Sequence, residues 1–129
     1  MALLEGRTAL VTGGTLGIGF GIAQTLAAHG AQVAVTGVTE EEGTQAREAG
    51  FDAYVLDVRD RESCSAVVAE VVEKFGGLSL LASNAGIYPQ APIAEMTDDD
   101  IDTIFDINVK GTVHIVQAAI PALTESGRG

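Results

Sequence analysis

The chain has 129 residues, of which 47% are hydrophobic and 5% aromatic, a composition typical of one globular domain and not of a disordered segment. Eighteen acidic residues against seven basic ones give a formal net charge of −11, so the surface as a whole repels nucleic acid and anionic membranes. The single cysteine, Cys64, excludes an internal disulfide framework.

No uninterrupted apolar run approaches the roughly 18 residues of a membrane-spanning helix. An early acid, Glu5, stands where a signal peptide would have its apolar core. Together with the lone Cys64, these features lead us to expect a cytoplasmic protein without a membrane partner.

The chain opens with an apolar run, residues 7–11, that we expect to form a strand. A helical pattern follows over residues 17–29 and stops at Gly30, because glycine adopts the left-handed conformation that ends helices. A second strand is expected over residues 32–36.

Thr39 and Glu42 have the spacing of a capping box, and they open a helix that we expect to end at Gly50. A third strand is expected over residues 52–56. The helical pattern over residues 59–75 then repeats apolar side chains every three or four positions, which predicts a helix with one buried face.

Gly76 and Gly77 separate that helix from a fourth strand, expected over residues 78–82. A loop with two prolines follows. Thr97 and the three aspartates after it then open a long helix that we expect to run to about Ala122, since acids favour the positive end of a helix.

This alternation of strands and helices predicts a parallel sheet, because right-handed crossovers place helices on its two faces. We therefore expect an α/β fold: a three-layer, Rossmann-like, doubly wound parallel sheet containing the first four β-α units. Nothing along the chain indicates a linker or a repeat, so residues 1–129 are expected to form one domain.

A glycine-rich turn joins the first strand to the first helix, between Thr12 and Gly19. A helix that starts there presents free backbone N–H groups and the positive end of its dipole, both of which suit a phosphate. Gly13, Gly17 and Gly19 would let a pyrophosphate approach without meeting a Cβ. The alternative is a tight turn without a ligand; we favour the phosphate because later segments agree with it.

Four motifs, in this order along essentially the whole chain, resemble those of the short-chain dehydrogenase/reductase family. They are the cofactor turn Thr12-Gly13-x-x-x-Gly17-Ile18-Gly19, the adenine pair Asp57-Val58, the motif Asn84-Ala85-Gly86 and the tetrad asparagine Asn108. Each motif alone is short enough to arise by chance, whereas all four in sequence indicate the family.

The resemblance implies an NAD(P)-binding Rossmann-type domain in an enzyme that transfers a hydride between nicotinamide and a small carbonyl or alcohol substrate. It implies one catalytic residue in this chain, Asn108, which would hold a water of the proton relay. The implied cofactor-binding residues are Thr12, Gly13, Thr15, Leu16, Gly17, Ile18, Gly19, Gly37, Val38, Asp57, Val58, Asn84, Ala85, Gly86 and Ile87.

Three of these polar residues also have structural interpretations. Asp57 could accept a hydrogen bond from the adenine amino group, or it could be an acid that ends a strand or caps a helix. Asn84 could contact the cofactor or lock neighbouring strand ends together. Asn108, in an apolar helix, could serve the proton relay or simply bend the helix with its amide satisfied.

The family's chemistry also uses a serine and a tyrosine and lysine spaced Y-x-x-x-K, and the pattern stops short of them here. Tyr54 is followed four residues later by Val58, and Tyr88 by Pro92. We therefore expect the isolated chain to be inactive and to supply the cofactor half of an enzyme that a second segment completes.

The apolar side of the last helix lacks cover within this chain, which also invites a partner. Its residues are Ile101, Ile104, Phe105, Val109, Val113, Val116 and Ile120. The resemblance implies a homotetramer in which this helix pairs across subunits.

The choice between NAD and NADP depends on the end of the second strand, where neither an aspartate nor an arginine stands. Leu16 occupies the turn position at which phosphate-preferring relatives place a basic residue. Glutamates at 40–42 disfavour an extra phosphate, so we favour NAD, while the hydroxyls of Thr36 and Thr39 leave NADP open.

Three remaining residues are interpreted structurally: Cys64 as apolar packing, His29 as the end of a helix, and His114 as a residue without metal-ligand neighbours. Two rival functions stay open. One is a non-catalytic dinucleotide-binding or oligomer-forming module, and the other is an α/β protein that binds a mononucleotide at the same turn.

Overall fold

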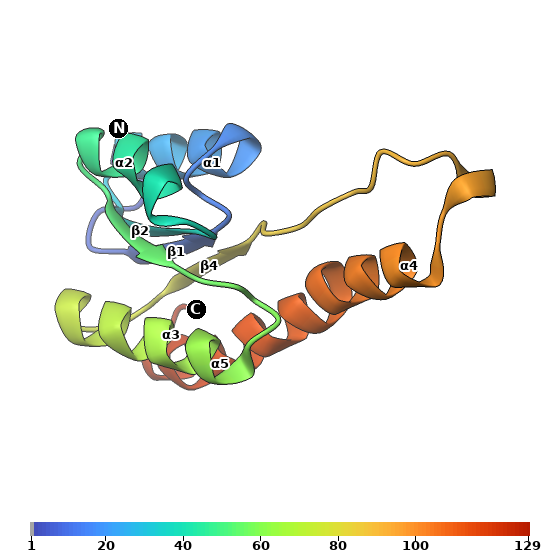
Figure 1. Ribbon diagram of the computed structural model, residues 1–129. Helices are drawn as coiled ribbons and strands as arrows, with labels where there is room; N and C mark the ends of the chain where they lie inside the picture. Colours follow the sequence, from blue (N-terminus) through green and yellow to red (C-terminus); the bar gives the residue numbers. More distant parts are fainter. Residues whose placement is uncertain (1) are drawn as a thin grey trace.

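The computed structural model describes residues 2–129, in which strands and helices alternate along the chain (Figure 1). The strands are β1 (Thr8–Thr12), β2 (Gln32–Gly37), β3 (Asp52–Val55) and β4 (Leu80–Ser83). The helices are α1 (Gly17–Ala28), α2 (Glu40–Glu48), α3 (Arg61–Phe75), α4 (Asp98–Phe105) and α5 (Gly111–Glu125). A short 3-10 turn, η1 (Ile93–Glu95), and a π-helical turn, η2 (Asp106–Lys110), flank α4.

The four strands form one parallel sheet in the order β3-β2-β1-β4. Ala9 of β1 lies opposite Val33 of β2 on one side and Leu80 of β4 on the other. Helices α1 and α2 cover one face of the sheet, and α3 and α5 cover the other (Figure 1). The three-layer, Rossmann-like, doubly wound parallel sheet expected from the alternation is confirmed.

Two apolar cores lie on the two faces of the sheet, and alternate residues of β1 enter them. Ala9 and Val11 pack under α1 and α2, whereas Leu10 packs against α3 and α5. All three side chains are fully buried. Cys64 is also fully buried in the second core, as its place in the apolar stripe of α3 predicts.

The boundaries of two elements differ from the expected ones by two residues. Helix α3 begins at Arg61 and not at 59, because the Asp60 carboxylate caps it by accepting a hydrogen bond from the Ser63 N–H at 3.1 Å. Strand β4 begins at Leu80 and not at 78. The carbonyl oxygen of Ser79 accepts from the Arg7 guanidinium at 2.9 Å, so the regular ladder starts one residue later.

The long helix expected from Thr97 to about Ala122 is present as a continuous helical run from Asp98 to Glu125, but its middle is π-helical, which was not predicted. Thr97 and Asp100 do form a complete capping box at its start. The α-helical pattern then gives way to η2 and resumes as α5 at Gly111. Gly111 packs directly on Val58, where an added Cβ would overlap the Val58 Cγ2 atom. A π turn is a one-residue insertion, and here it precedes this close contact.

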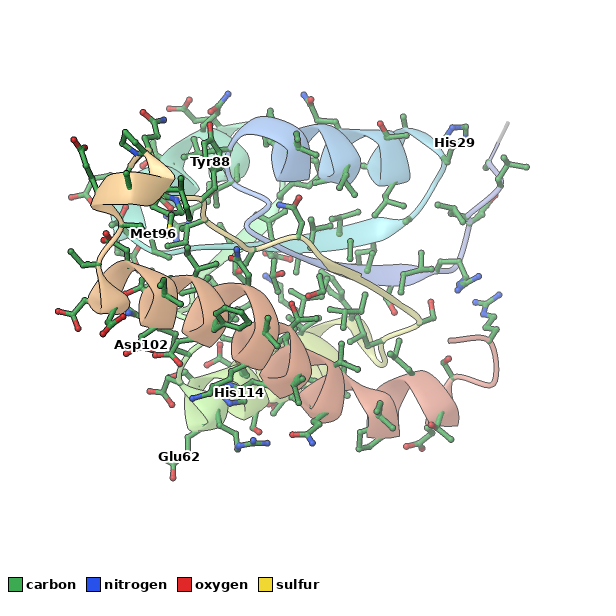
Figure 2. The ribbon with its side chains drawn as sticks, turned by 90° about the vertical axis from the view of Figure 1, so that its right-hand side faces the viewer. His29, Glu62, Tyr88, Met96, Asp102 and His114 are labelled. Atoms are coloured by element: carbon green, nitrogen blue, oxygen red, sulfur yellow. The ribbon has the colours of Figure 1, made fainter. Side chains whose placement is uncertain are left out.

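Figure 1 shows α4 and the segment before it extending beyond the sheet, and Figure 2 shows Met96, just before α4, on the side of the molecule opposite His29. Among the helices of residues 2–129, none has the length and continuous apolar character that a bilayer crossing requires.

Candidate functional site

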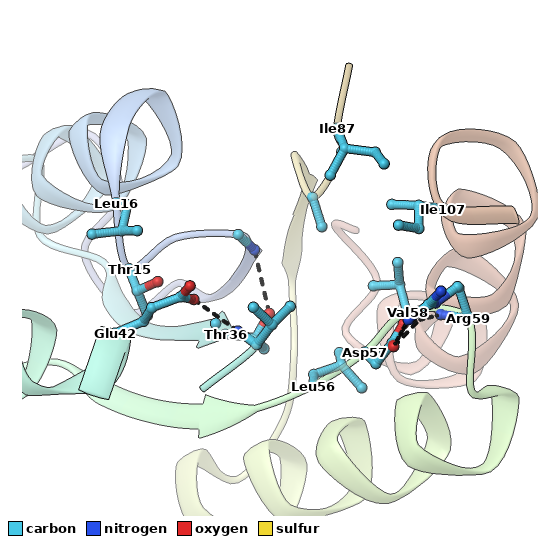
Figure 3. Close-up of a pocket in the computed structure, with 15 residues that line it drawn as sticks. Thr15, Leu16, Thr36, Glu42, Leu56, Asp57, Val58, Arg59, Ile87 and Ile107 are labelled. Atoms are coloured by element: carbon cyan, nitrogen blue, oxygen red, sulfur yellow. Dashed lines mark hydrogen bonds and ion pairs between the residues drawn. The ribbon is translucent and has the colours of Figure 1, made fainter. Parts of the chain in front are cut away.

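A cavity of about 410 Å³ lies at the carboxyl edge of the sheet (Figure 3). Strand β1 leads from this edge to α1 on one face of the sheet, and β4 leads through the extended segment to α5 on the other. Doubly wound sheets bind their ligands at the point where neighbouring strands send their helices to opposite faces. The cavity occupies that switch point.

The turn after β1 depends on glycine backbone geometry. Gly13 has a φ of +63° and Gly17 a φ of +54°, conformations that residues with a Cβ rarely adopt. The turn is fixed to β2, because the N–H of Gly14 donates to the Thr36 carbonyl at 3.0 Å and the N–H of Gly13 to the Thr36 hydroxyl at 3.3 Å. The strand-to-helix turn is therefore held in one conformation at the cavity wall.

The first turn of α1 begins at this wall with its backbone N–H groups pointing back toward the start of the helix. Leu16 is the N-cap residue and lines the cavity, and its apolar side chain offers no acceptor. The first intrahelical bond joins the Phe20 N–H to the Leu16 carbonyl at 3.1 Å, so the helix itself does not satisfy the N–H groups of residues 17–19. Such a helix start suits an anion, and phosphate above all.

Gly19 serves packing between α1 and the turn. A Cβ at this position would overlap the Gly13 carbonyl oxygen and lie 2.5 Å from Asn84 Nδ2. Gly19 is buried and does not line the cavity. This position needs glycine for close helix–strand approach, and direct contact of Gly19 with a ligand stays a prediction.

Thr12 and Asn84 lock the ends of β1 and β4 together. The fully buried Thr12 hydroxyl accepts from the N–H groups of Asn84 at 3.0 Å and Ala85 at 3.1 Å. In return, Asn84 Nδ2 donates to the Gly13 carbonyl at 3.2 Å. The structural interpretation of Asn84 is thus confirmed, and its contact with a cofactor stays a prediction.

Asp57 lies on the opposite side of the cavity from the glycine turn, and it is paired with Arg59 (Figure 3). The shortest contact joins Arg59 Nη2 to Asp57 Oδ2 at 2.6 Å, and the N–H of Arg59 donates to Asp57 Oδ1 at 3.0 Å. These hydrogen bonds from Arg59 hold the pKa of Asp57 below its usual value. The carboxylate is therefore ionised at neutral pH, and nearly half of its side-chain surface remains exposed.

Glu42 lines the cavity at the end of β2, although it belongs to α2. Thr39 caps the helix by accepting from the Glu42 N–H at 3.3 Å, as the spacing predicted. The reciprocal bond of a capping box is missing from this pair, because Glu42 Oε2 accepts from the Val38 N–H at 2.9 Å instead. The Glu42 carboxylate is thus held beside the carboxyl end of β2.

Asn108 lies in the π turn η2 and joins it to the segment after β4. Its Oδ1 accepts from the Ile87 N–H at 2.8 Å, and its Nδ2 donates to the Ile87 carbonyl at 2.6 Å. Gly86 is close beside it, since an added Cβ would lie 3.1 Å from Asn108 Oδ1. The interpretation of Asn108 as an amide with satisfied hydrogen bonds is confirmed, whereas its effect on helix bending and its part in a proton relay stay predictions.

His114 stands on α5 (Figure 2) and does not line the cavity. Its Nδ1 lies 2.8 Å from the Val58 carbonyl oxygen, which can only accept, so Nδ1 carries the proton. Between residues 2 and 129, His, Cys, Asp and Glu side chains form no group of three that could hold a metal ion.

The structure brings most of the residues expected to bind a cofactor to this one cavity. Those that line it are Gly13, Thr15, Leu16, Gly37, Val38, Asp57, Val58, Ala85, Gly86 and Ile87. The expected cofactor-binding residues outside the lining are Thr12, Gly17, Ile18, Gly19 and Asn84, and the expected catalytic residue Asn108 also lies outside it. Ile18 is largely exposed on α1, and Gly17 faces open space.

Five more residues line the cavity that were not among those expected to bind the cofactor. They are Thr36, Glu42, Leu56, Arg59 and Ile107. Thr36 and Glu42 were considered only for the choice between NAD and NADP, and Glu42 also as a capping residue. Arg59 could have been found from its place two residues after Asp57, which suits an ion pair across a tight turn. Nothing in the sequence indicated Ile107.

Curated proteins similar to this chain are sugar-alcohol dehydrogenases among others. It is 39% identical to the sorbitol dehydrogenase of Cereibacter sphaeroides over 129 residues, covering 98% of this chain and 50% of that protein. It is 37% identical to the galactitol 2-dehydrogenase of Agrobacterium fabrum, again covering 98% of this chain and 50% of that protein. The chain thus spans about half the length of these relatives.

The solved structures similar to this chain are also dehydrogenases, and the chain again covers about half of each. A short chain dehydrogenase from Burkholderia cenocepacia J2315, in complex with NADP, superposes with a TM-score of 0.83 at 40% identity, over 93% of this chain and 52% of that one. The ligand-free aldohexose dehydrogenase of Thermoplasma acidophilum superposes with a TM-score of 0.86 at 27% identity, over 96% and 47%.

The family model for short chain dehydrogenases matches residues 7–129, which include every strand of the sheet and every residue that lines the cavity. With the fold, the glycine turn and the relatives in agreement, the chain belongs to the short chain dehydrogenase family.

Proposed function

We propose that this chain forms the dinucleotide-binding part of an NAD(P)-dependent oxidoreductase that transfers a hydride between nicotinamide and a small carbonyl or alcohol substrate. The observation that carries the proposal is the start of α1, whose first N–H groups stand beside the glycine turn at the switch-point cavity. A solved relative at 40% identity holds NADP, which supports this ligand class.

The residues around the cavity fit a dinucleotide. Gly17 would hold the diphosphate, because it has a positive φ and a Cβ there would stand in open space, where the phosphates would pass. Apolar side chains of Leu56, Val58 and Ile107 form the opposite wall and would hold the adenine ring. Asp57, ionised beside them, would accept a hydrogen bond from the adenine amino group.

The bound cofactor supplies or takes the hydride, and this chain's residues position it. Asn108 fixes the backbone of Ile87, which borders the cavity after β4. We propose that the acid–base tyrosine belongs to residues outside this chain. Tyr54 and Tyr88 both lack a lysine four residues later, and the chain spans about half of its relatives. The 129-residue chain alone would then bind cofactor without catalysis.

A second candidate function, assembly through the last helices, is favoured by their exposed apolar face. Ile101, Phe105, Val109, Val113 and Ile120 are between 39% and 56% exposed. We propose that a completing segment and a further subunit cover this face, in a cytoplasmic homotetramer.

The dinucleotide site is tested by calorimetric titration of NAD and NADP into the natural, full-length protein and two glycine variants. Gly17→Ala adds a methyl group where the diphosphate would pass, so both affinities should fall by about tenfold or more. Gly76→Ala is the matched control. Gly76 also has a positive φ, +77°, and open space around its Cβ position, but it ends α3.

Both variants carry a similar backbone strain, on the order of 1–2 kcal/mol. The proposal is overturned if the unaltered protein binds neither dinucleotide, or if the two variants bind equally well. A preference for ATP over both dinucleotides would favour the mononucleotide-binding alternative.

A further inference from the structure

We infer that Glu42 makes this site prefer NAD to NADP, a deepening that rests on the proposed dinucleotide function. In doubly wound sheets an acid near the end of the second strand holds the 2′-hydroxyl of the adenosine ribose, and a basic residue there accommodates a 2′-phosphate. In this chain β2 ends at Gly37, which has no side chain for either purpose. The carboxylate comes instead from the first turn of α2.

The geometry places the Glu42 carboxylate over Gly37. A Cβ on Gly37 would lie 2.9 Å from Glu42 Oε2 and 2.7 Å from the hydroxyl oxygen of Thr15. The carboxylate and this hydroxyl therefore occupy the space that an acidic side chain at position 37 would otherwise use. Figure 3 shows Glu42 beside Thr15 at one end of the cavity, across from Asp57.

Two hydrogen bonds hold the glutamate in this position. Its own N–H donates to the Thr39 hydroxyl at 3.3 Å, and its Oε2 accepts from the Val38 N–H at 2.9 Å. The second bond also engages the N–H of Val38, a donor that a phosphate oxygen at the end of β2 would need. Glu42 thus removes a phosphate-binding group as well as adding a negative charge.

The cations of this region are already paired. Arg47, on the same helix, pairs with Glu40 at 3.1 Å, and Arg59, across the cavity, pairs with Asp57 at 2.6 Å. Glu42 accepts its bond from a neutral amide, so that bond leaves its charge uncompensated. A 2′-phosphate would meet this charge at short range, whereas a 2′-hydroxyl could donate a hydrogen bond to it.

The similar Burkholderia short chain dehydrogenase was solved in complex with NADP. Titration distinguishes a preference for NADP from the preference for NAD that we infer for this chain. We would titrate NAD and NADP into the natural, full-length protein, into Glu42→Gln and into Glu41→Gln. In Glu42→Gln the new amide oxygen can still accept from Val38, so the start of α2 is preserved while the charge is removed. Glu41→Gln is the matched control: it removes the same charge from an exposed neighbour that does not line the cavity.

The unaltered protein should bind NAD about tenfold or more tightly than NADP. In Glu42→Gln the NADP affinity should rise about tenfold and the NAD affinity should fall about threefold to fivefold, since a charge-assisted hydrogen bond becomes a neutral one. Glu41→Gln should leave the ratio of the two affinities within about twofold. Circular dichroism and the thermal midpoint would report whether each variant is folded.

A second measurement avoids substitution altogether. Adenosine 5′-monophosphate should compete for the site of the unaltered protein better than adenosine 2′,5′-bisphosphate, because only the latter carries the extra phosphate. The inference is overturned by a preference for NADP or for the bisphosphate, or by an unchanged affinity ratio in folded Glu42→Gln. Binding of neither dinucleotide by the unaltered protein would instead overturn the proposed function, and the role of Glu42 with it.

Discussion

Asn108 and Ile87 are joined by a pair of hydrogen bonds in which the asparagine amide mimics a neighbouring strand. Its Oδ1 accepts from the Ile87 N–H at 2.8 Å, and its Nδ2 donates to the Ile87 carbonyl at 2.6 Å. The pair connects the π turn η2 with the segment after β4, which otherwise runs out from the sheet toward α4. The Asn108 side chain thus holds the backbone of Ile87 at the edge of the cavity.

Removing that side chain should loosen the rim locally. In Asn108→Ala we expect the amide hydrogen of Ile87 to exchange about fivefold to tenfold faster with solvent, since one protecting hydrogen bond of about 1 kcal/mol is lost. Native-state hydrogen exchange measures this. Val109→Ala is the control, because it shortens an exposed neighbour in the same turn. Unchanged protection of the Ile87 amide in Asn108→Ala would show that the Asn108 side chain does not hold this segment.

The ion pair between Arg59 and Asp57, across the cavity from the glycine turn, predicts how the pKa of Asp57 responds to substitution of Arg59. Hydrogen bonds from Arg59 hold the pKa of Asp57 below the ordinary 3.8, so Arg59→Gln should raise that pKa toward 3.8. Carbon-detected NMR of the Asp57 carboxyl measures it. Arg61→Gln, which removes a nearby guanidinium bonded to Gln117, should leave the pKa of Asp57 low.

The same shift fixes the direction of a pH effect on stability. A carboxylate with a lowered folded pKa stabilises the fold above its unfolded pKa, and this contribution disappears as the pH falls through the folded pKa. The unaltered protein should therefore lose stability below about pH 4 slightly more steeply than Arg59→Gln. Because Asp57 is 46% exposed, we expect a difference below about 1 kcal/mol. A steeper loss in the variant would contradict the pairing.

Sequence periodicity predicted the order of the elements because the central strands β1 and β2 are buried on both faces, and the helices that pack on the sheet are buried on one. Those patterns are local, so Ala9, Leu10 and Val11 could be assigned to a strand without knowing their partners. The π turn could not be predicted in the same way. It accompanies the contact between Gly111 and Val58, residues far apart in the chain, and no apolar spacing encodes that contact.

The residues of the candidate site also divide into those that local sequence predicts and those that depend on where side chains point in the fold. Gly13 was predictable from a motif, because a positive φ requires glycine wherever the turn occurs. Glu42 and Arg59 reach the cavity through side-chain hydrogen bonds to Val38 and Asp57. The sequence shows that Glu42 and Arg59 lie close to expected cofactor-binding residues, Val38 and Asp57, but it does not show in which direction their side chains point.

Cys64 should be unreactive while the protein is folded. The side chain is fully buried, and burial raises the pKa of its thiol, so little thiolate is present at neutral pH. We expect iodoacetamide to label the unaltered protein only as fast as it unfolds. Ser65→Cys, at an exposed neighbouring position of α3, should add one rapidly labelled thiol. Rapid labelling of Cys64 without denaturant would show that α3 is not packed as described.

The contact between Gly111 and Val58 makes a prediction whose sign is opposite to ordinary helix propensity. Replacing a helical glycine by alanine normally stabilises a protein by about 0.5–1 kcal/mol. Gly21→Ala in α1 should do so, because its Cβ would meet nothing within 4 Å. Gly111→Ala should instead destabilise the fold by about 1–3 kcal/mol, since the new methyl group overlaps Val58 Cγ2.

The cause can be isolated by shortening the partner. In the Val58→Ala background the overlapping methyl groups are absent, so Gly111→Ala should become neutral or stabilising, and the two substitutions should couple by about 1 kcal/mol or more. Urea unfolding of the four proteins of this cycle gives the coupling directly. If Gly111→Ala stabilised the protein as Gly21→Ala does, or if its cost were the same with alanine at 58, then α5 would not be seated on Val58. The wall of the cavity that Val58 forms would then lie elsewhere.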